Sequence, residues 1–150
     1  MIPEAKFIKS EIVVRELSLP DDVLIARKSI VRWLALSLGL ILPNESRTLL
    51  LDIFDVLLEF HMKNIQPTTK EIIERLEKTG GEKQNPKAVY YHLQRLTGMG
   101  ILKRNKGKYY FGDGNGEKIS DVFKDFYRNK TDTAFGNIEK ALKRLETSYK

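Results

Sequence analysis

The residues best suited to bind another molecule lie in one stretch, NPKAVYYHLQRLTGMGILKRNKGKYYF, from Asn85 to Phe111. Positions 83–112 hold seven lysines or arginines and no aspartate or glutamate. These seven charges exceed the net charge of +6 for the whole chain, so the remaining residues sum to −1. A local excess of positive charge attracts a polyanion. The stretch therefore predicts a surface that binds nucleic acid.

The first half of this stretch has the pattern of an amphipathic helix. Asn85 can cap its start, and Pro86 suits the first turn because an N–H there would have no partner. Gly98 and Gly100 are expected to end it. Its apolar line consists of Val89, Leu93 and Leu96. A rotation of about 100° per residue places Lys87, Tyr91 and Gln94 opposite Leu93, with Tyr90 and Arg95 at the edges of this polar, aromatic and basic outward side.

The second half of the stretch predicts a β-hairpin. Two strand-like runs, Ile101–Arg104 and Lys108–Phe111, flank the sequence Asn-Lys-Gly, in which the glycine supplies a positive φ. The hairpin carries four bases, Lys103, Arg104, Lys106 and Lys108. It would present them beside the outward side of the preceding helix.

Two further helices are expected before the basic stretch. Asn44 or Ser46 can cap a helix that continues to about Asn64 and carries a wide apolar stripe. Thr68 and Glu71 then have the spacing of a capping box. They predict a short helix that stops at Gly80 and Gly81.

Residues 1–43 are expected to form an arm and an aliphatic helix. The segment from Lys6 to Leu19 fits either a short strand or an irregular arm, and its role is open. Asp21 and Asp22 can cap a helix that continues toward Gly39, with Trp33 anchored in the core. The apolar run 29–42 is interrupted by an arginine and is shorter than the roughly 20 residues a bilayer requires.

Residues 114–150 predict a helical segment with two apolar stripes. The first consists of Ile119, Val122, Phe123 and Phe126. The second follows the spacing of a coiled-coil seam and consists of Phe135, Ile138, Leu142, Leu145 and Tyr149. We expect this seam to form a homodimer; the alternative is that the helix folds back onto its own domain.

The order of helix, short helix, helix and basic hairpin, together with AVYYHLQRLTGMGIL at 88–102, resembles winged helix-turn-helix transcriptional regulators related to the PadR, MarR and ArsR families. The resemblance covers residues 46 to about 112. The hairpin matches in character rather than by a fixed motif, and the aliphatic N-terminal region departs from the commonest members. The resemblance implies a mainly α fold with a small β-hairpin wing. Residues 44–113 would form the winged helix-turn-helix DNA-binding domain, extended by helices at both ends.

A narrower resemblance combines RKSIVRWLALSLGLILPNESR at 27–47 with VYYHLQRL at 89–96. Both segments are similar to those of small archaeal winged-helix regulators, among them euryarchaeal activators of archaellum genes. That family implies an activator that helps to recruit the basal transcription factor TFB to weak promoters.

The basic surface favours a sequence-specific regulator that binds double-stranded DNA. A major groove admits one α-helix, whose polar side chains meet base edges, while bases on the hairpin meet phosphates. The alternatives are a winged-helix module that docks on proteins of the transcription machinery and an RNA-binding module. A protein-docking helix would need an apolar outward side, and an RNA module would need aromatic stacking platforms.

The sequence offers no pattern for catalysis, a metal or a cofactor. Without cysteine there is no disulfide, thiolate zinc site or cysteine nucleophile, which favours a reducing cytoplasm. The two histidines, His61 and His92, lack metal-ligand spacing. GDGNGE at 112–117 fits neither a phosphate-binding nor a calcium-binding template and is expected to be a tight loop. We therefore expect no enzyme activity.

Overall fold

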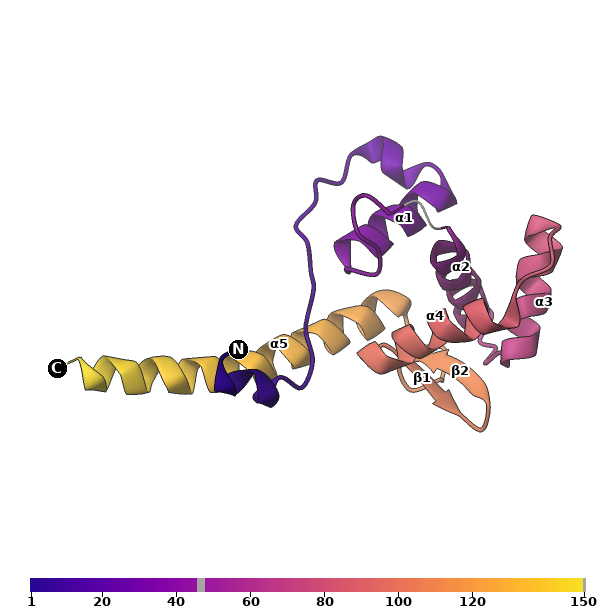
Figure 1. The fold of residues 1–150 in the computed structure, drawn as a ribbon. Helices are drawn as coiled ribbons and strands as arrows, with labels where there is room; N and C mark the ends of the chain where they lie inside the picture. The colour runs from indigo at the N-terminus through magenta and orange to yellow at the C-terminus, as the bar shows by residue number, and fades with distance from the viewer. Residues whose placement is uncertain (46–47, 150) are drawn as a thin grey trace.

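The computed structural model describes residues 1–45 and 48–149, which are mainly helical with a small two-stranded antiparallel hairpin (Figure 1). This confirms the coarse fold class predicted from the sequence. The elements in chain order are η1 (Pro3–Phe7), η2 (Asp21–Leu24), α1 (Arg27–Ser37), α2 (Leu49–Met62), α3 (Thr69–Gly80), α4 (Pro86–Met99), β1 (Leu102–Asn105), β2 (Lys108–Phe111) and α5 (Ile119–Ser148). None of the described helices is both long enough and apolar enough to cross a bilayer.

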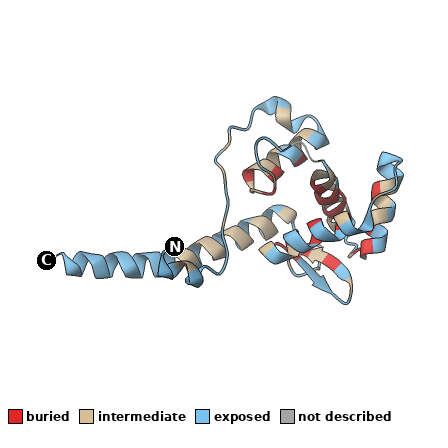
Figure 2. Ribbon diagram, in the orientation of Figure 1, coloured by how far each residue is buried: buried red, intermediate tan, exposed pale blue. Residues whose placement is uncertain are grey.

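The core is built around α2, which packs against α1, α3, α4 and β2. Its buried positions recur on the helical period and form the largest block of buried residues in Figure 2. They are Leu50, Ile53, Phe54, Val56 and Leu57. The helix starts after Thr48, so the predicted cap at Asn44 is wrong, and the alternative cap Ser46 lies outside the described residues. Its end near Asn64, where φ is 55°, agrees with the prediction.

The caps predicted for α3 and α4 are present. Thr68 and Glu71 form the reciprocal capping box of α3, and Gly81 ends that helix in the left-handed conformation. The Asn85 side chain accepts a hydrogen bond of 3.0 Å from the backbone N–H of Lys87 at the start of α4. Gly100, with φ of 90°, terminates α4, whereas Gly98 lies within the helix and does not end it as predicted.

The hairpin has a register in which Asn105 faces Lys108 across a two-residue turn. Lys106 and Gly107 both have positive φ, as the tight turns of twisted hairpins require. β1 begins at Leu102, one residue later than predicted. The segment before α3 also pairs with β2, on the edge opposite β1. There the N–H of Tyr109 donates to the carbonyl of Pro67 over 2.8 Å. This pairing ties the hairpin to the start of α3.

The N-terminal helix is divided into two pieces, which corrects the prediction of one helix capped by Asp21 and Asp22. Both aspartates lie inside η2, and α1 begins after Ala26 without a side-chain cap. Ile25 at the break remains 84% exposed, so continuing the helix there would have buried no apolar surface. Trp33 is only half-buried and is not a core anchor. Its indole N–H donates to the carbonyl of Ser18 over 2.8 Å and so holds the arm.

The first twenty residues form an irregular arm that contains one short 3-10 helix, η1, rather than a strand. Arg15 fastens the arm to the C-terminal end of α1. Its guanidinium donates to the carbonyls of Leu36 and Ile41, over 2.6 and 3.0 Å, and its backbone N–H donates to Ser37. A cation at the C-terminal end of α1 also interacts favourably with the helix dipole.

α5 is one continuous helix with two different environments (Figure 2). Near its start, the ring of Phe123 lies 6.2 Å from that of Phe54 and 5.5 Å from that of Phe111, measured between centroids. From Phe135 onward every described residue is exposed. The distal half therefore does not fold back onto its own domain, which was the alternative left open by the sequence.

Candidate nucleic-acid interface

The outward side of α4 consists of the side chains predicted from the sequence. Val89, Leu93 and Leu96 are buried against the core. The opposite side is exposed and comprises Lys87, Tyr90, Tyr91, Gln94 and Arg95. Because its inner side is fixed by packing, α4 presents this outward side in a defined orientation.

Arg95 lies at the edge of this outward side rather than at its centre. Its Nη2 donates to the carbonyl of Leu40 over 3.4 Å, at the turn that follows α1. The guanidinium therefore contacts the N-terminal region in this structure. This hydrogen bond ties α4 to that turn.

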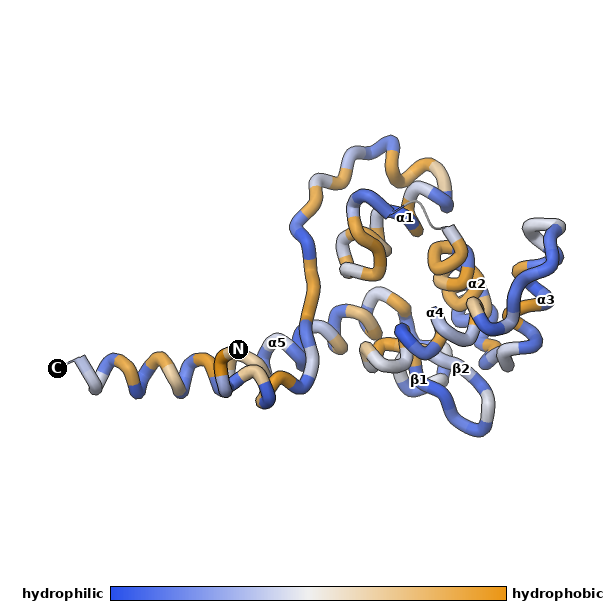
Figure 3. Tube along the Cα trace, in the orientation of Figure 1, coloured by the Kyte–Doolittle hydropathy of each residue, from blue (hydrophilic) through white to orange (hydrophobic). Residues whose placement is uncertain are grey.

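The bases of the hairpin are distributed over both of its faces and its tip, which is hydrophilic in Figure 3. In the register, Arg104 lies opposite the buried Tyr109, and its guanidinium lies 5.2 Å from the centroid of the Tyr109 ring. The Tyr109 hydroxyl in turn accepts from Thr69 over 3.3 Å. A cation–π contact and a fixed ring hold Arg104 in place. Lys103 extends from the opposite face of β1, while Lys106 and Lys108 are exposed at the turn.

An acidic side chain lies beside this basic surface, although none occurs within residues 83–112 of the sequence. The Glu71 carboxylate accepts hydrogen bonds from the backbone N–H and hydroxyl of Thr68, over 3.1 and 3.0 Å. These bonds, with a smaller contribution from the charge of Lys108, hold the pKa of Glu71 below its usual range. Glu71 is therefore ionised at neutral pH and offsets part of the positive charge at Lys108.

The structure also adds a base that the sequence analysis missed. Lys70 is exposed in the first turn of α3, next to Thr69, which contacts Tyr109 of the hairpin. Its place in the sequence, outside the basic stretch, gave no reason to select it. The pairing of residue 68 with β2 brings this end of α3 to the hairpin.

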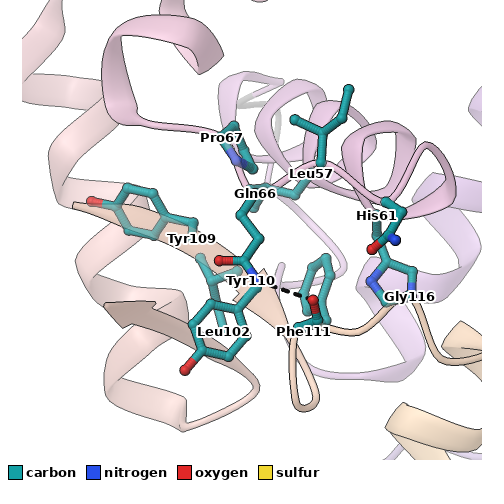
Figure 4. Close-up of a pocket in the computed structure, with 12 residues that line it drawn as sticks. Leu57, His61, Gln66, Pro67, Leu102, Tyr109, Tyr110, Phe111 and Gly116 are labelled. Carbon is teal, nitrogen blue, oxygen red and sulfur yellow. Dashed lines mark hydrogen bonds between the residues drawn. The ribbon is translucent and has the colours of Figure 1, made fainter. Parts of the chain in front are cut away.

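The loop GDGNGE after the hairpin is a structural connection, as predicted. The Gln66 side chain donates to the carbonyl of Gly114 over 3.0 Å (Figure 4). Nε2 of His61 lies 2.6 Å from the carbonyl oxygen of Glu117 and must carry a proton to donate to it. The space enclosed by the loop and the end of α2 measures about 10 Å³, enough for about one water molecule. In the described part of the chain, no group of three or more His, Cys, Asp or Glu residues could hold a metal.

Comparison with known families, curated proteins and solved structures finds no match for this chain. The family resemblance therefore rests on the residues quoted for it in the sequence.

Proposed function

We propose that the protein is a sequence-specific, double-stranded DNA-binding transcription regulator of the winged helix-turn-helix class. One observation carries the proposal: the exposed polar side of α4 and the bases of the hairpin belong to rigid elements that share one core. In this proposal α4 is the recognition helix in the major groove, and the hairpin is the wing on the phosphate backbone.

The side chains of α4 have the chemistry that base recognition requires. The amide of Gln94 can donate and accept at once, as pairing with the N6 and N7 edge of adenine demands. Lys87 can donate to the acceptors of guanine, and the hydroxyls of Tyr90 and Tyr91 can do either. The four bases of the wing bind phosphates and set the orientation of α4 without reading sequence.

The distal half of α5 supports a homodimer as part of this proposal. A single recognition helix contacts only a few base pairs, whereas two helices related by a dyad read half-sites about 34 Å apart. The five seam residues at 135–149 are each at least 45% exposed and lie along one side of a helix that projects from the domain. A second seam would cover them, and the operator would then be two-fold symmetric.

Salt dependence and two kinds of substitution test DNA binding. If each subunit neutralises four to five phosphates, log K should fall against log salt with a slope of roughly −4 per subunit. Lys106→Ala should weaken binding to every sequence and flatten the slope by about one, whereas Gln94→Ala should relax preference at one or two base positions. Lys140→Ala, an equally exposed base on distal α5, is the control and should change neither. A slope near zero would contradict the proposal.

A second candidate is docking on a protein of the transcription machinery, for which the archaeal resemblance suggests TFB. The observation that favours it is a cleft of about 440 Å³ along α1. Figure 1 shows α1 on the opposite side of α2 from the hairpin. Apolar side chains of Trp33, Leu36, Ile41, Leu42 and Pro43 line it, with Arg32 and Glu45 among its charged residues.

This candidate has its own test. Leu42→Asp places a charge on a half-exposed wall of the cleft. It should weaken binding to purified TFB at least tenfold, about 1.4 kcal/mol, and leave the affinity for DNA unchanged. Equal binding of TFB by the variant and the wild type would remove the cleft from consideration. Either function places the protein with the chromosome, in the cytoplasm.

A further inference from the structure

The seam of distal α5 has little apolar area to spare for holding two copies together. Its five side chains are 59%, 45%, 53%, 49% and 84% exposed in chain order from Phe135 to Tyr149. If a large side chain presents roughly 170 Å² when fully exposed, they offer about 500 Å² per copy. A stable interface buries about 800 Å² per partner, of which roughly 60% is apolar, so the seam alone would supply this area only if all five side chains became completely buried.

The N-terminal arm supplies further exposed apolar surface beside α5. Ile2, Phe7 and Ile8 are 71%, 68% and 66% exposed, which corresponds to roughly 350 Å² on the same scale. Nζ of Lys130 donates to the hydroxyl of Ser10 over 3.4 Å, and Figure 1 shows η1 alongside the middle of α5. The apolar residues of the arm thus lie close to where the seam begins.

The half-buried residues of α5 indicate which side of the helix the arm occupies. Between the stripe on the core and the seam, Tyr127, Lys130, Thr131 and Ala134 are partly covered. At about 100° per residue, Lys130 continues the core-facing stripe, Thr131 continues the line of the seam, and Tyr127 and Ala134 lie between the two. An arm on that side borders the seam without covering it, so the two apolar surfaces are continuous.

We propose that a second copy of this chain docks on a composite surface formed by the α5 seam together with Ile2, Phe7 and Ile8 of the arm. The inference rests on the proposed homodimer and names the segment that completes it. A second copy is the occupant because the seam has the self-complementary heptad spacing and because seam and arm together reach the area of a stable interface. The distal half of α5 carries charges of both signs, Glu139, Lys140, Lys143, Arg144 and Glu146, with a sum of only +1, so two copies meet without a large net repulsion.

The composite surface assigns a function to the arm. Arg15 and the Trp33–Ser18 hydrogen bond fix its far end on α1, so the arm joins α1 to the dimer interface. A helix pair of only two heptads is marginal alone. The arms would form a second layer over it, so each copy contributes two elements to the interface.

The test compares two double variants by sedimentation velocity across a concentration series. Phe7→Ser with Ile8→Ser should raise the dimer dissociation constant at least tenfold while circular dichroism stays unchanged, because both side chains are exposed in the single chain. The matched control, Leu24→Ser with Ile25→Ser, removes apolar side chains of similar size, 51% and 84% exposed, at the η2–α1 junction. It should leave the constant unchanged.

A second measurement does not require the interface to be disrupted. The chain has no cysteine, so Phe7→Cys can carry a polarity-sensitive thiol dye. The dye should shift to shorter wavelength as concentration drives dimerisation, and the same dye on Ile25→Cys should not shift. If the wild type dimerises and Leu142→Asp abolishes the dimer, but neither measurement on the arm changes, the composite surface is wrong and the dimer forms through the α5 seam alone. If wild type is monomeric at all concentrations, the proposed homodimer fails, and this inference with it, while the salt slope still decides DNA binding.

Discussion

The two halves of α5 belong to one helix but differ in what their apolar residues contact. In the first half, Phe123 and Phe126 pack against the core of the domain. In the second half, Phe135 and Leu142 follow an equally regular spacing and remain 59% and 53% exposed. Along the distal half, hydrophobic and hydrophilic positions alternate in Figure 3. Apolar periodicity thus predicts a helix with a face to bury, but not which molecule covers that face.

Rotation about the helix axis explains why one domain cannot cover both halves. Phe135 follows Phe126 by nine residues, about two and a half turns, so the two rings lie on opposite sides of α5. The side of the distal half that continues the core-facing stripe is polar, with Lys130 and Asn137 near it. The apolar residues of α5 therefore change sides between Phe126 and Phe135. The domain core ends there, and a separate interface is expected beyond it.

The largest expected effect comes from a charge in the seam. Leu142→Asp should give a folded monomer, because two buried carboxylates per dimer each cost roughly 2 kcal/mol or more. The dimer dissociation constant should rise by about 1000-fold, measured by light scattering and sedimentation, and operator binding should weaken with it.

Lys140→Asp is the control for this change, because position 140 lies on the opposite side of the same turn of α5. It introduces the same carboxylate and should leave the dimer intact. A Leu142→Asp protein that unfolds would place the seam in the domain core. One that stays dimeric with unchanged affinity would exclude the seam as the interface.

The same truncation in the two halves should separate folding from assembly. Phe123→Ala removes a ring that contacts Phe54 and Phe111, and should lower the free energy of unfolding by about 3 kcal/mol. Phe135→Ala should change the unfolding of the monomer by about 0.5 kcal/mol or less, because its side chain is 59% exposed. Urea denaturation at concentrations below the dimer range measures both. Equal losses would show that distal α5 packs on its own domain.

The sequence predicted the elements whose local signals agree with their tertiary contacts. The capping box of Thr68 and Glu71, the caps at Asn85 and Gly100, and the turn at Gly107 act within a few residues. The outward side of α4 followed from the rotation of a helix whose inner side was apolar. These signals need no knowledge of the rest of the chain.

Prediction from the sequence failed where contacts between distant segments determine a residue's position. Trp33 appeared to be a core residue, but Ser18 of the arm accepts its N–H at the surface. Glu71 lies close to Lys108 only because the segment before α3 pairs with β2, and that pairing leaves no periodic pattern. The break between η2 and α1 was missed because Asp21 and Asp22 are good caps by composition, while Ile25 finds no surface to cover it.

A third comparison uses two glutamate–lysine pairs at i, i+4, one in the core helix α2 and one in distal α5. Glu59 accepts from Lys63 and, through both oxygens, from Arg75 at 3.0 Å, and its side chain is 16% exposed. The hydrogen bonds from Arg75 hold its pKa below the usual range. Because the folded pKa is depressed, the stabilisation is present above the unfolded pKa of about 4.3 and is lost as pH falls through the folded pKa.

Glu59→Gln should therefore lower the free energy of unfolding by about 1–2 kcal/mol at neutral pH. The difference from wild type should shrink below about pH 4. Glu139→Gln breaks a pair with Lys143 whose side chains are 65% and 69% exposed, and should have no measurable effect at any pH. Thermal melts over a pH series measure both. A pH-independent loss for Glu59→Gln would mean that its packing, not its charge, stabilises the fold.

The smallest expected effect concerns two glycines that both have open space where a Cβ would be added. Gly136 lies within α5, at the start of the distal half, and Gly81 ends α3 with φ of +71°. Gly136→Ala should stabilise the helix by roughly 0.5–1 kcal/mol, because alanine loses less backbone entropy in a helix. Gly81→Ala should destabilise the fold by about 1 kcal/mol, because a side chain disfavours positive φ. Far-ultraviolet circular dichroism and urea denaturation distinguish the two. If Gly136→Ala also tightens the dimer, dimerisation depends on how well α5 is formed in each copy. If the substitution raises helicity but leaves the dimer dissociation constant unchanged, α5 is already fully helical at Gly136 in the dimer.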